Sequence, residues 1–309
     1  MPSMEVSLSS ITLGTAQLGM DYGIANTRGM PDVEQCFEIL DFAWEHGVTA
    51  FDTAGVYGTS EQIIGEWLRK RGVHPVLITK IPSFGKMEFS TPNEVKKFIL
   101  RNASESLRRL NVSQVWCLML HSPEMLSKYN DEVYESLSRF KENGGAQHFG
   151  ISVYRKEEMV NIFSNKLFNI YQAPINIFNM KQYEDPAVMK YFNDPEHFLF
   201  ARSIYLQGLF FLSPDAAEQK VPGSGGLIAK LQEISDKFSI AIDRIALYFV
   251  KQLPFVSSIA IGCETKQQVM NNLALLHDPI IPSGILEDVA NTFRLVPENV
   301  IDPRKWKRS

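Results

Sequence analysis

Residues 51–61 read FDTAGVYGTSE, and this stretch decides the fold. The short apolar segment Val48 to Phe51 leads into it and is typical of a buried strand, whereas the residues after it follow the pattern of an amphipathic helix. Asp52 therefore stands at the carboxyl end of a predicted strand, and Tyr57 follows in the connecting loop. Junctions of this kind carry the chemistry in barrels of alternating strands and helices.

Two later predicted strands also end in a polar side chain. Val76 to Thr79 runs into Lys80, and Val115 to Leu120 runs into His121. Taken singly, such residues are usually helix caps, surface ion pairs or satisfied structural side chains. The carboxyl ends of parallel strands meet on one face of a barrel, so polar groups from three successive strands are expected to converge there. The candidate catalytic group is therefore Asp52, Tyr57, Lys80 and His121.

The alternation of strand and helix continues along the chain. Predicted strands cover residues 11–16, 48–51, 76–79, 115–120, 148–152, 168–174, 198–203 and 257–261. Predicted helices cover residues 31–46, 59–71, 91–110, 131–143, 156–164, 185–193, 227–238 and 243–252, and a last barrel helix starts at Thr265. The sequence thus predicts an α/β fold, a single (β/α)8 TIM barrel domain over residues 1–309, with an extra C-terminal helix at 283–293. Barrels of this type typically use about 250 residues.

Two helix starts and one connection carry local signals. Thr59 and Gln62 have the spacing of a capping box, and the run Thr91-Pro92-Asn93-Glu94 supplies an N-cap, a first-turn proline and an acid. Residues 205–226 are expected to form a loop, and loops of that length are usually functional or disordered. The glycine-rich residues 222–226 within it are interpreted as a hinge or a helix lead-in rather than a phosphate loop, and no Gly-x-Gly-x-x-Gly follows a strand.

Composition excludes several classes of protein. A formal net charge of −4 argues against a nucleic-acid-binding protein, and no apolar run approaches the length of about 18 residues that spans a membrane. The three cysteines, Cys36, Cys117 and Cys263, lack metal-ligand spacing, so no metal site is expected. Their sparse, odd number is typical of a reducing compartment and predicts a cytoplasmic protein. The basic stretch 304–308 is expected to be a solvated tail, and the oligomeric state stays open.

The motifs together resemble the aldo-keto reductase family. The resemblance covers about residues 11–276, in the order of the family's motifs. It rests on Leu13-Gly14-Thr15-Ala16, Phe51-Asp52-Thr53-Ala54 with Tyr57-Gly58 and Ser60-Glu61, Thr79-Lys80, Leu120-His121-Ser122-Pro123, Gly150-Ile151-Ser152, and Ile261-Gly262 ahead of Gln268 and Asn272.

The resemblance implies the reduction of a carbonyl group by a nicotinamide cofactor. A phenol is a poor acid near neutral pH, because its unperturbed pKa is about 10, and a nearby ammonium lowers that pKa. The expected roles are Tyr57 as the acid, Lys80 and Asp52 as the pair that tunes it, and His121 as the group that orients the substrate oxygen.

The resemblance also implies where the cofactor lies. The nicotinamide is expected beside Ser152 and Gln172, with Arg202 where an aromatic residue often stacks and Val153 where an Asn is common. The pyrophosphate is expected below Gln207 and Gly208. The remaining implied contacts are Gly14, Thr15 and Asp52, and on the adenosine side Gly262, Thr265, Gln268 and Asn272. No Lys or Arg occupies the Gly262 or Gln268 position and Glu264 lies between them, so NADP(H) is favoured by the family default and NAD(H) is the alternative.

The substrate is expected to be a small carbonyl compound, with a sugar as one candidate, because aromatic and flexible side chains gather near the site. These are Met20, Tyr22, Phe84 and Tyr205. Two other functions stay open. One is a nucleotide-binding regulatory protein of the same fold with little turnover. The other is a Schiff-base enzyme that uses Lys80 as its nucleophile, which borohydride trapping would detect.

Overall fold

Eight parallel strands close into a barrel in the computed structural model, which describes residues 7–180 and 183–306. The strands are β1 (Ile11–Gly14), β2 (Ala50–Asp52), β3 (Val76–Ile81), β4 (Val115–Leu120), β5 (Ala146–Ser152), β6 (Phe168–Pro174), β7 (Phe198–Arg202) and β8 (Ser258–Gly262). Each strand pairs with its neighbour in sequence, and β8 pairs with β1, from Ile11 opposite Ile259 to Gly14 opposite Gly262. The predicted (β/α)8 barrel is confirmed.

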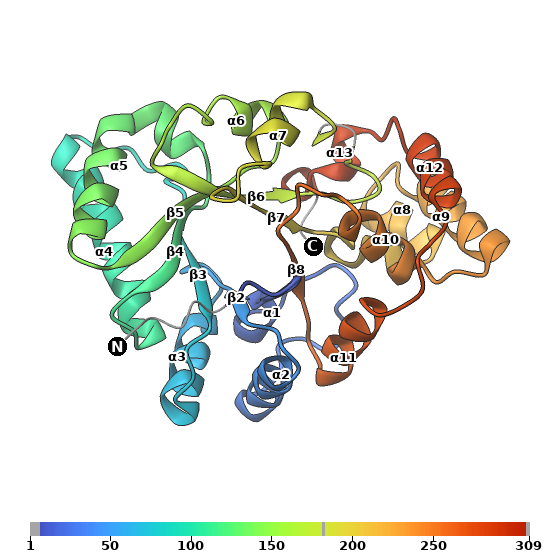
Figure 1. The fold of residues 1–309 in the computed structure, drawn as a ribbon, viewed down its shortest axis with the longest axis horizontal. Coiled ribbons are helices and arrows are strands. Elements are labelled where there is room, and N and C mark those ends of the chain that lie inside the picture. The colour runs from blue at the N-terminus through green and yellow to red at the C-terminus, as the bar shows by residue number, and fades with distance from the viewer. Residues whose placement is uncertain (1–6, 181–182, 307–309) are drawn as a thin grey trace.

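Helices surround the strands on the outside (Figure 1). They are α1 (Ala16–Gly19), α2 (Val33–Glu45), α3 (Ser60–Arg71), α4 (Pro92–Leu110), α5 (Glu124–Glu142), α6 (Lys156–Val160), α7 (Pro186–Tyr191), α8 (Pro214–Lys220), α9 (Gly225–Phe238), α10 (Ile242–Lys251), α11 (Lys266–Leu275), α12 (Ser283–Thr292) and α13 (Glu298–Ile301), with 3₁₀ turns η2 (Leu206–Phe211) and η3 (Pro303–Lys305). The ring closes where α11 packs beside α2 (Figure 1). The extra C-terminal helix corresponds to α12.

Apolar side chains fill the barrel from both sides of its wall. One large core lies between the strands and the helices, and it includes Phe51, Leu77 and Leu118. A second, smaller cluster consists of Ile78, Cys117, Met119, Ile170 and Phe200. Side chains of consecutive strand residues point to opposite faces, so members of the second cluster point into the barrel interior. The interior is thus packed rather than open, as is typical of this fold.

The helix starts differ in how they are capped. In α4, the Thr91 side chain accepts a hydrogen bond from the Glu94 backbone N–H at 3.3 Å, as predicted. The predicted capping box of Thr59 is wrong, because its side chain makes no capping bond. The Thr59 backbone N–H instead donates to the Gly19 carbonyl at 3.1 Å, so the contact with α1 fixes the start of α3.

Residues 205–226 are not the long loop that the sequence predicted. They form the 3₁₀ turn η2 and the helix α8, and α9 begins at Gly225. Ser213 caps α8 by accepting from the Ala216 backbone N–H. The Glu218 carboxylate accepts from the backbone N–H groups of Gly223 and Gly225 at 2.8 and 2.9 Å and so fixes the glycine-rich turn. The helix after β4 also differs from the prediction. The structure has α5 beginning at Glu124, earlier than the predicted start at residue 131, and the helix is kinked at Tyr129.

The described part of the basic tail folds back onto the barrel instead of extending into solvent as predicted. The Trp306 Nε1–H donates to the backbone carbonyls of Asn299 and Val300, and the Arg304 guanidinium lies 3.7 Å from the centre of the Tyr154 ring. Residues 307–309 lie outside the described part of the chain.

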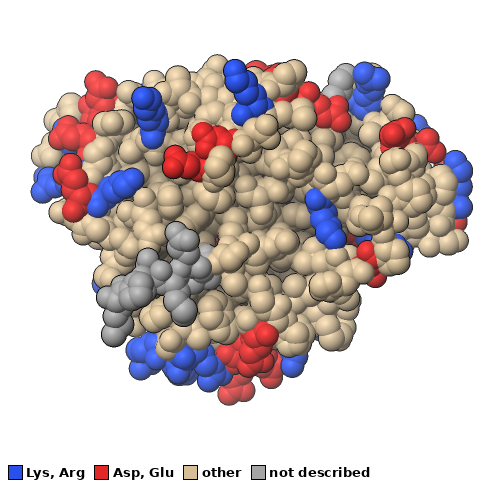
Figure 2. Space-filling model, in the orientation of Figure 1, with Lys and Arg blue, Asp and Glu red and all other residues tan. Residues whose placement is uncertain are grey.

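Charged side chains of both signs are interspersed around the rim of the face shown in Figure 2, and its centre is mostly uncharged. That face carries no continuous basic surface of the kind that binds nucleic acid. Within the described residues, every helix is too short or too polar to cross a membrane.

Candidate active site

The pleat of the strands places a ring of polar side chains above the apolar interior. The layer below consists of Ile78, Met119, Ile170 and Phe200. Two residues further along the same chain segments stand Lys80, His121, Gln172 and Arg202, in that order. Because residues two apart in a strand share a face, these four side chains also point into the barrel, at the carboxyl ends of their strands. Asp52 closes β2 at the same level, with Phe51 on the outer face.

An ion pair between Lys80 and Asp52 forms the floor of the site. The Lys80 Nζ donates to Asp52 Oδ1 at 2.6 Å and to the Thr53 carbonyl at 3.0 Å. Lys80 is 0% exposed and Asp52 5% exposed. A pair this deeply buried is tolerated only when each charge is compensated at close range, which these contacts provide.

Tyr57 lies over this floor, on the loop between β2 and α3. Its ring centre is 5.1 Å from Lys80 Nζ and 6.0 Å from the His121 ring, which meets it edge-on at 83°. The loop is held against α1 by close backbone contact: a Cβ atom on Gly58 would lie 2.0 Å from the Gly19 carbonyl oxygen. Gly58 also has a φ of +55°, which favours glycine. The position of Tyr57 thus depends on two glycines.

The local charges act differently on the two rings. Burial, and then the charge of Asp52, raise the pKa of Tyr57, while the charge of Arg202 lowers it. Burial lowers the pKa of His121 to about 3, and the charges of Lys80 and Arg202 act in the same direction. His121 is therefore a neutral imidazole near pH 7. The sequence argument expected Lys80 to act on the phenol, and its Nζ lies 5.1 Å from the centre of the Tyr57 ring. The charge of Arg202 is a further one that lowers the pKa of Tyr57.

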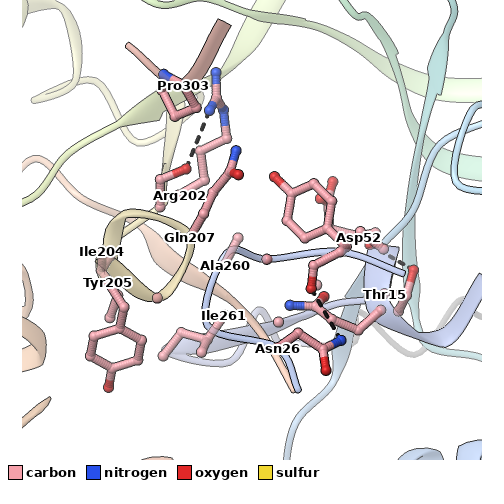
Figure 3. Close-up of a pocket in the computed structure, with 18 of the residues that line it drawn as sticks. Thr15, Asn26, Asp52, Arg202, Ile204, Tyr205, Gln207, Ala260, Ile261 and Pro303 are labelled. Atoms are coloured by element: carbon pink, nitrogen blue, oxygen red, sulfur yellow. Dashed lines mark hydrogen bonds between the residues drawn. The ribbon is translucent and has the colours of Figure 1, made fainter. Parts of the chain in front are cut away.

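These groups open into a cavity of about 670 Å³. Figure 3 shows Asp52 and Thr15 on one side of it and Arg202, Gln207 and Pro303 on the other. Most residues predicted for the site line this cavity: Gly14, Thr15, Met20, Tyr22, Asp52, Tyr57, His121, Ser152, Gln172, Arg202, Tyr205, Gln207, Gly208, Gly262, Gln268 and Asn272.

Three predicted residues lie elsewhere. Lys80 is covered by the groups above it and is not part of the cavity wall. Thr265 caps α11, where its side chain accepts from the Gln268 backbone N–H at 3.2 Å. The prediction of Phe84 as a substrate contact is wrong, since Phe84 is 3% exposed. It belongs to an aromatic cluster beside α4 and α5, with ring centres 5.0 to 5.5 Å from those of Phe89, Tyr129 and Phe98.

The segment after β7 has an unusual backbone. Ser203, Leu206 and Gln207 have positive φ angles of 57°, 47° and 54°. Such conformations are uncommon for residues other than glycine, and they cluster at functional sites. The Gln207 carbonyl accepts a hydrogen bond from the Ile24 backbone N–H at 3.0 Å, so the loops after β1 and β7 meet at the cavity.

The cavity has features that suit a nicotinamide cofactor. The Gln172 Nε2 atom is buried and has no hydrogen-bond partner within the described residues, so it can donate to an amide oxygen of a ligand. At the other end, Gln268 and Asn272 are already engaged, Gln268 Oε1 by the Glu264 backbone N–H at 2.6 Å and Asn272 Oδ1 by the Tyr205 hydroxyl at 2.7 Å. Glu264 lines this end of the cavity. The described residues contain no cluster of three or more His, Cys, Asp or Glu that could hold a metal ion.

Sequence reasoning missed part of the wall. Tyr154, Asp243, Pro303 and Arg304 line the cavity. Tyr154 follows Ser152 and Val153 just beyond β5, so its place after a strand end was a signal that could have found it. Arg304 had no such signal, because it reaches the cavity only through the path of the tail.

Three comparisons place the chain among known proteins. The model of the Aldo/keto reductase family matches residues 10–283. The norsolorinic acid reductase of Emericella nidulans is 26% identical over 304 residues, covering 89% of this chain and 76% of that protein. The D-arabinose 1-dehydrogenase of Saccharomyces cerevisiae is 30% identical over 155 residues, which is 48% of this chain and 44% of that protein.

A solved structure, the aldo-keto reductase AKR11C1 from Bacillus halodurans in its holo form, superposes with a TM-score of 0.73. It covers 96% of each chain at 20% identity and therefore bears on the fold alone. The family model covers nearly all of the barrel, and the named relatives are a reductase and a dehydrogenase. This chain is an oxidoreductase that belongs to the aldo/keto reductase family.

Proposed function

We propose that the chain reduces an aldehyde or ketone, with a sugar as one candidate, to an alcohol, and that Tyr57 is the proton donor. One observation carries this proposal: Tyr57, His121 and the Lys80–Asp52 pair converge at one end of a cavity whose length also holds the residues expected to bind a cofactor. A nicotinamide cofactor supplies the hydride when bound.

Each of these groups has its own role in the proposed reaction. The carbonyl oxygen accepts the proton of the Tyr57 hydroxyl as negative charge develops on it, and the hydride goes to the carbonyl carbon. His121, a neutral imidazole, donates an N–H hydrogen bond that orients the same oxygen. The phenolate that remains lies near two positive charges, Arg202 and Lys80, before water returns its proton.

The Schiff-base alternative has little support. A nucleophilic amine must be neutral and accessible. Lys80 is fully buried, is paired with Asp52 at 2.6 Å and does not reach the cavity wall.

The cofactor contacts are part of the proposal. Ser152 and Gln172 are assigned to the nicotinamide, Gln207 and Gly208 to the pyrophosphate, and Gly262, Gln268 and Asn272 to the adenosine. NADP(H) is the family default, but the acidic Glu264 in the wall would face a 2′-phosphate unfavourably. We therefore expect modest discrimination between NADPH and NADH. A cytoplasmic location belongs to the same proposal.

The test is the Tyr57→Phe variant, assayed for oxidation of NADPH and NADH with 4-nitrobenzaldehyde. Turnover should fall by about 10²–10⁴, the usual contribution of a positioned acid, while cofactor affinity measured by fluorescence titration stays within a few-fold. A Tyr57→Phe variant that binds cofactor and keeps wild-type turnover would refute the assignment. Cofactor binding by the wild type without turnover of any carbonyl compound would favour the regulatory alternative.

A further inference from the structure

Arg202 is the cation in the cavity wall whose charge lacks a partner within the described residues. It ends β7, is part-buried and lines the cavity. Its Nη2 donates to the Val153 carbonyl at 3.2 Å and its Nη1 to the Ser203 hydroxyl at 3.4 Å, both neutral acceptors. No carboxylate of residues 7–180 or 183–306 lies within ion-pair distance of it. A guanidinium removed from bulk water without an anion is costly, so such a group is usually kept for a ligand.

Two other cations near this end of the cavity are compensated. Lys80 is paired with Asp52. Arg304 is paired with Asp302 through three contacts, Nη2 to Oδ2 at 2.7 Å and Nε to Oδ1 and Oδ2 at 2.9 and 3.1 Å. The positive charge left over at this end of the cavity therefore belongs to Arg202.

Arg202 is also held in a fixed orientation. Its guanidinium lies 4.3 Å from the centre of the Tyr154 ring, and Arg304 lies 3.7 Å from the same centre. The Tyr154 ring thus contacts two guanidinium groups, one of which Asp302 holds in place. A guanidinium has five N–H donors arranged to match the two oxygens of an oxyanion. Two of the five N–H donors of Arg202 make hydrogen bonds within the described residues, so the guanidinium is oriented and three donors are available to a ligand.

We propose that Arg202 binds an oxyanion of the substrate, so that the preferred carbonyl compound carries a carboxylate or a phosphate. This inference rests on the proposed function, because it takes the cavity to be the place where a carbonyl group meets Tyr57. An oxyanion site at Arg202 is compatible with a nicotinamide beside the same residue. The nicotinamide ring would stack on the flat face of the guanidinium, whereas the oxyanion would accept hydrogen bonds from its N–H edge.

The test compares pairs of related substrates in which one member carries an anionic group and the other is neutral. One pair is 4-carboxybenzaldehyde and methyl 4-formylbenzoate, and the other is glyceraldehyde 3-phosphate and glyceraldehyde. We expect kcat/KM of the wild type to be about 10- to 100-fold higher for the charged member of at least one pair, equivalent to about 1.4–2.8 kcal/mol. The pair that shows the preference identifies the source of the oxyanion, carboxylate or phosphate. Equal kcat/KM within both pairs would overturn the inference and leave the proposed function standing.

Two variants assign the preference to Arg202. Arg202→Gln should bring the ratio of charged to neutral kcat/KM close to one, and Arg202→Lys should keep part of it, because charge remains but the fork is lost. The control is Arg155→Gln, which removes an equal charge from an exposed side chain outside the cavity wall. This control should keep the wild-type ratio. A ratio that survives Arg202→Gln, or that falls equally in Arg155→Gln, overturns the inference.

A binding measurement separates this inference from the proposed function. Calorimetry of the full chain with its cofactor compares 4-(hydroxymethyl)benzoate with its methyl ester, and glycerol 3-phosphate with glycerol. If no carbonyl compound is reduced, the proposed function fails, and this comparison alone decides the inference. Tighter binding of a charged ligand that is lost in Arg202→Gln supports an oxyanion site. Equal affinity of the wild type for the charged and neutral ligands overturns it. So does an Arg202→Gln variant that loses affinity for the cofactor but not for the charged ligand.

Discussion

The contact between Gly19 and the Tyr57 loop gives a sharp test of how the site is positioned. In the Gly19→Ala variant, the new Cβ atom would lie 2.0 Å from the Tyr57 carbonyl oxygen and 2.3 Å from the Ser60 backbone nitrogen. The first distance is closer by about 1.4 Å than an ordinary contact of 3.4 Å. Because both neighbours are backbone atoms, no rotation of a side chain relieves the clash, and the loop that carries Tyr57 has to move.

The size of that movement sets the expected effect. A displacement of about 1 Å in a catalytic group costs about 10²-fold in rate. We therefore expect kcat for aldehyde reduction to fall about 100-fold in Gly19→Ala. The free energy of unfolding should fall by about 1–3 kcal/mol, as is usual when an atom is forced into a packed region. Cofactor affinity should change less than kcat, since most of the proposed cofactor contacts come from other loops.

The assay is NADPH or NADH oxidation with 4-nitrobenzaldehyde, together with urea unfolding and cofactor titration. The matched control is Gly226→Ala in α9, where a Cβ atom meets nothing within 4 Å and φ is not positive. This control should keep wild-type kcat and be neutral or slightly more stable, because alanine favours a helix over glycine. A Gly19→Ala protein with wild-type kcat would show that the loop position does not control Tyr57, and the argument would fail.

Three further predictions concern charge. Lys80→Met leaves Asp52 buried without its cation, so urea unfolding should show a loss of about 3–5 kcal/mol, and the double variant with Asp52→Asn should regain stability but not activity. The low pKa of His121, about 3, means that the unfolded chain binds a proton there below about pH 6.5 while the folded chain does not. The free energy of unfolding should therefore decrease as the pH is lowered from about 6.5 to about 3, by up to about 1.4 kcal/mol per pH unit from this group. The His121→Gln variant should show a smaller decrease, whereas the variant of the exposed His74, His74→Gln, should behave as the wild type does. The wild type should prefer NADPH over NADH by less than about a thousandfold, or about 4 kcal/mol, and Glu264→Gln should move the preference towards NADPH in a fluorescence titration.

The parts of the site that the sequence predicted well are those set by strand periodicity. Once Val76 to Thr79 is taken as a buried strand, the side-chain period of two fixes which of its neighbours face the interior. Gln172 and Arg202 were implied by the family resemblance, and the structure brings both into the cavity wall, two residues beyond Ile170 and Phe200 of the interior cluster. The helix caps were predicted less well. The Thr91 signal held because it is local, while the Thr59 signal failed because a contact with Gly19, distant in sequence, determines the backbone there.

The walls of the cavity could not be predicted because they arise from contacts between segments far apart in the chain. The Ile24 N–H bond to Gln207 joins two loops, and the stacking of Arg304 on Tyr154 depends on how the tail returns to the barrel. The isolation of Arg202 is of the same kind. A sequence can show that an arginine ends a strand, but it does not show that Lys80 pairs with Asp52 and Arg304 with Asp302 while, among the described residues, Arg202 contacts only neutral acceptors. The way in which these three cations are paired depends on how distant segments meet in the fold, and no single stretch of the chain contains it.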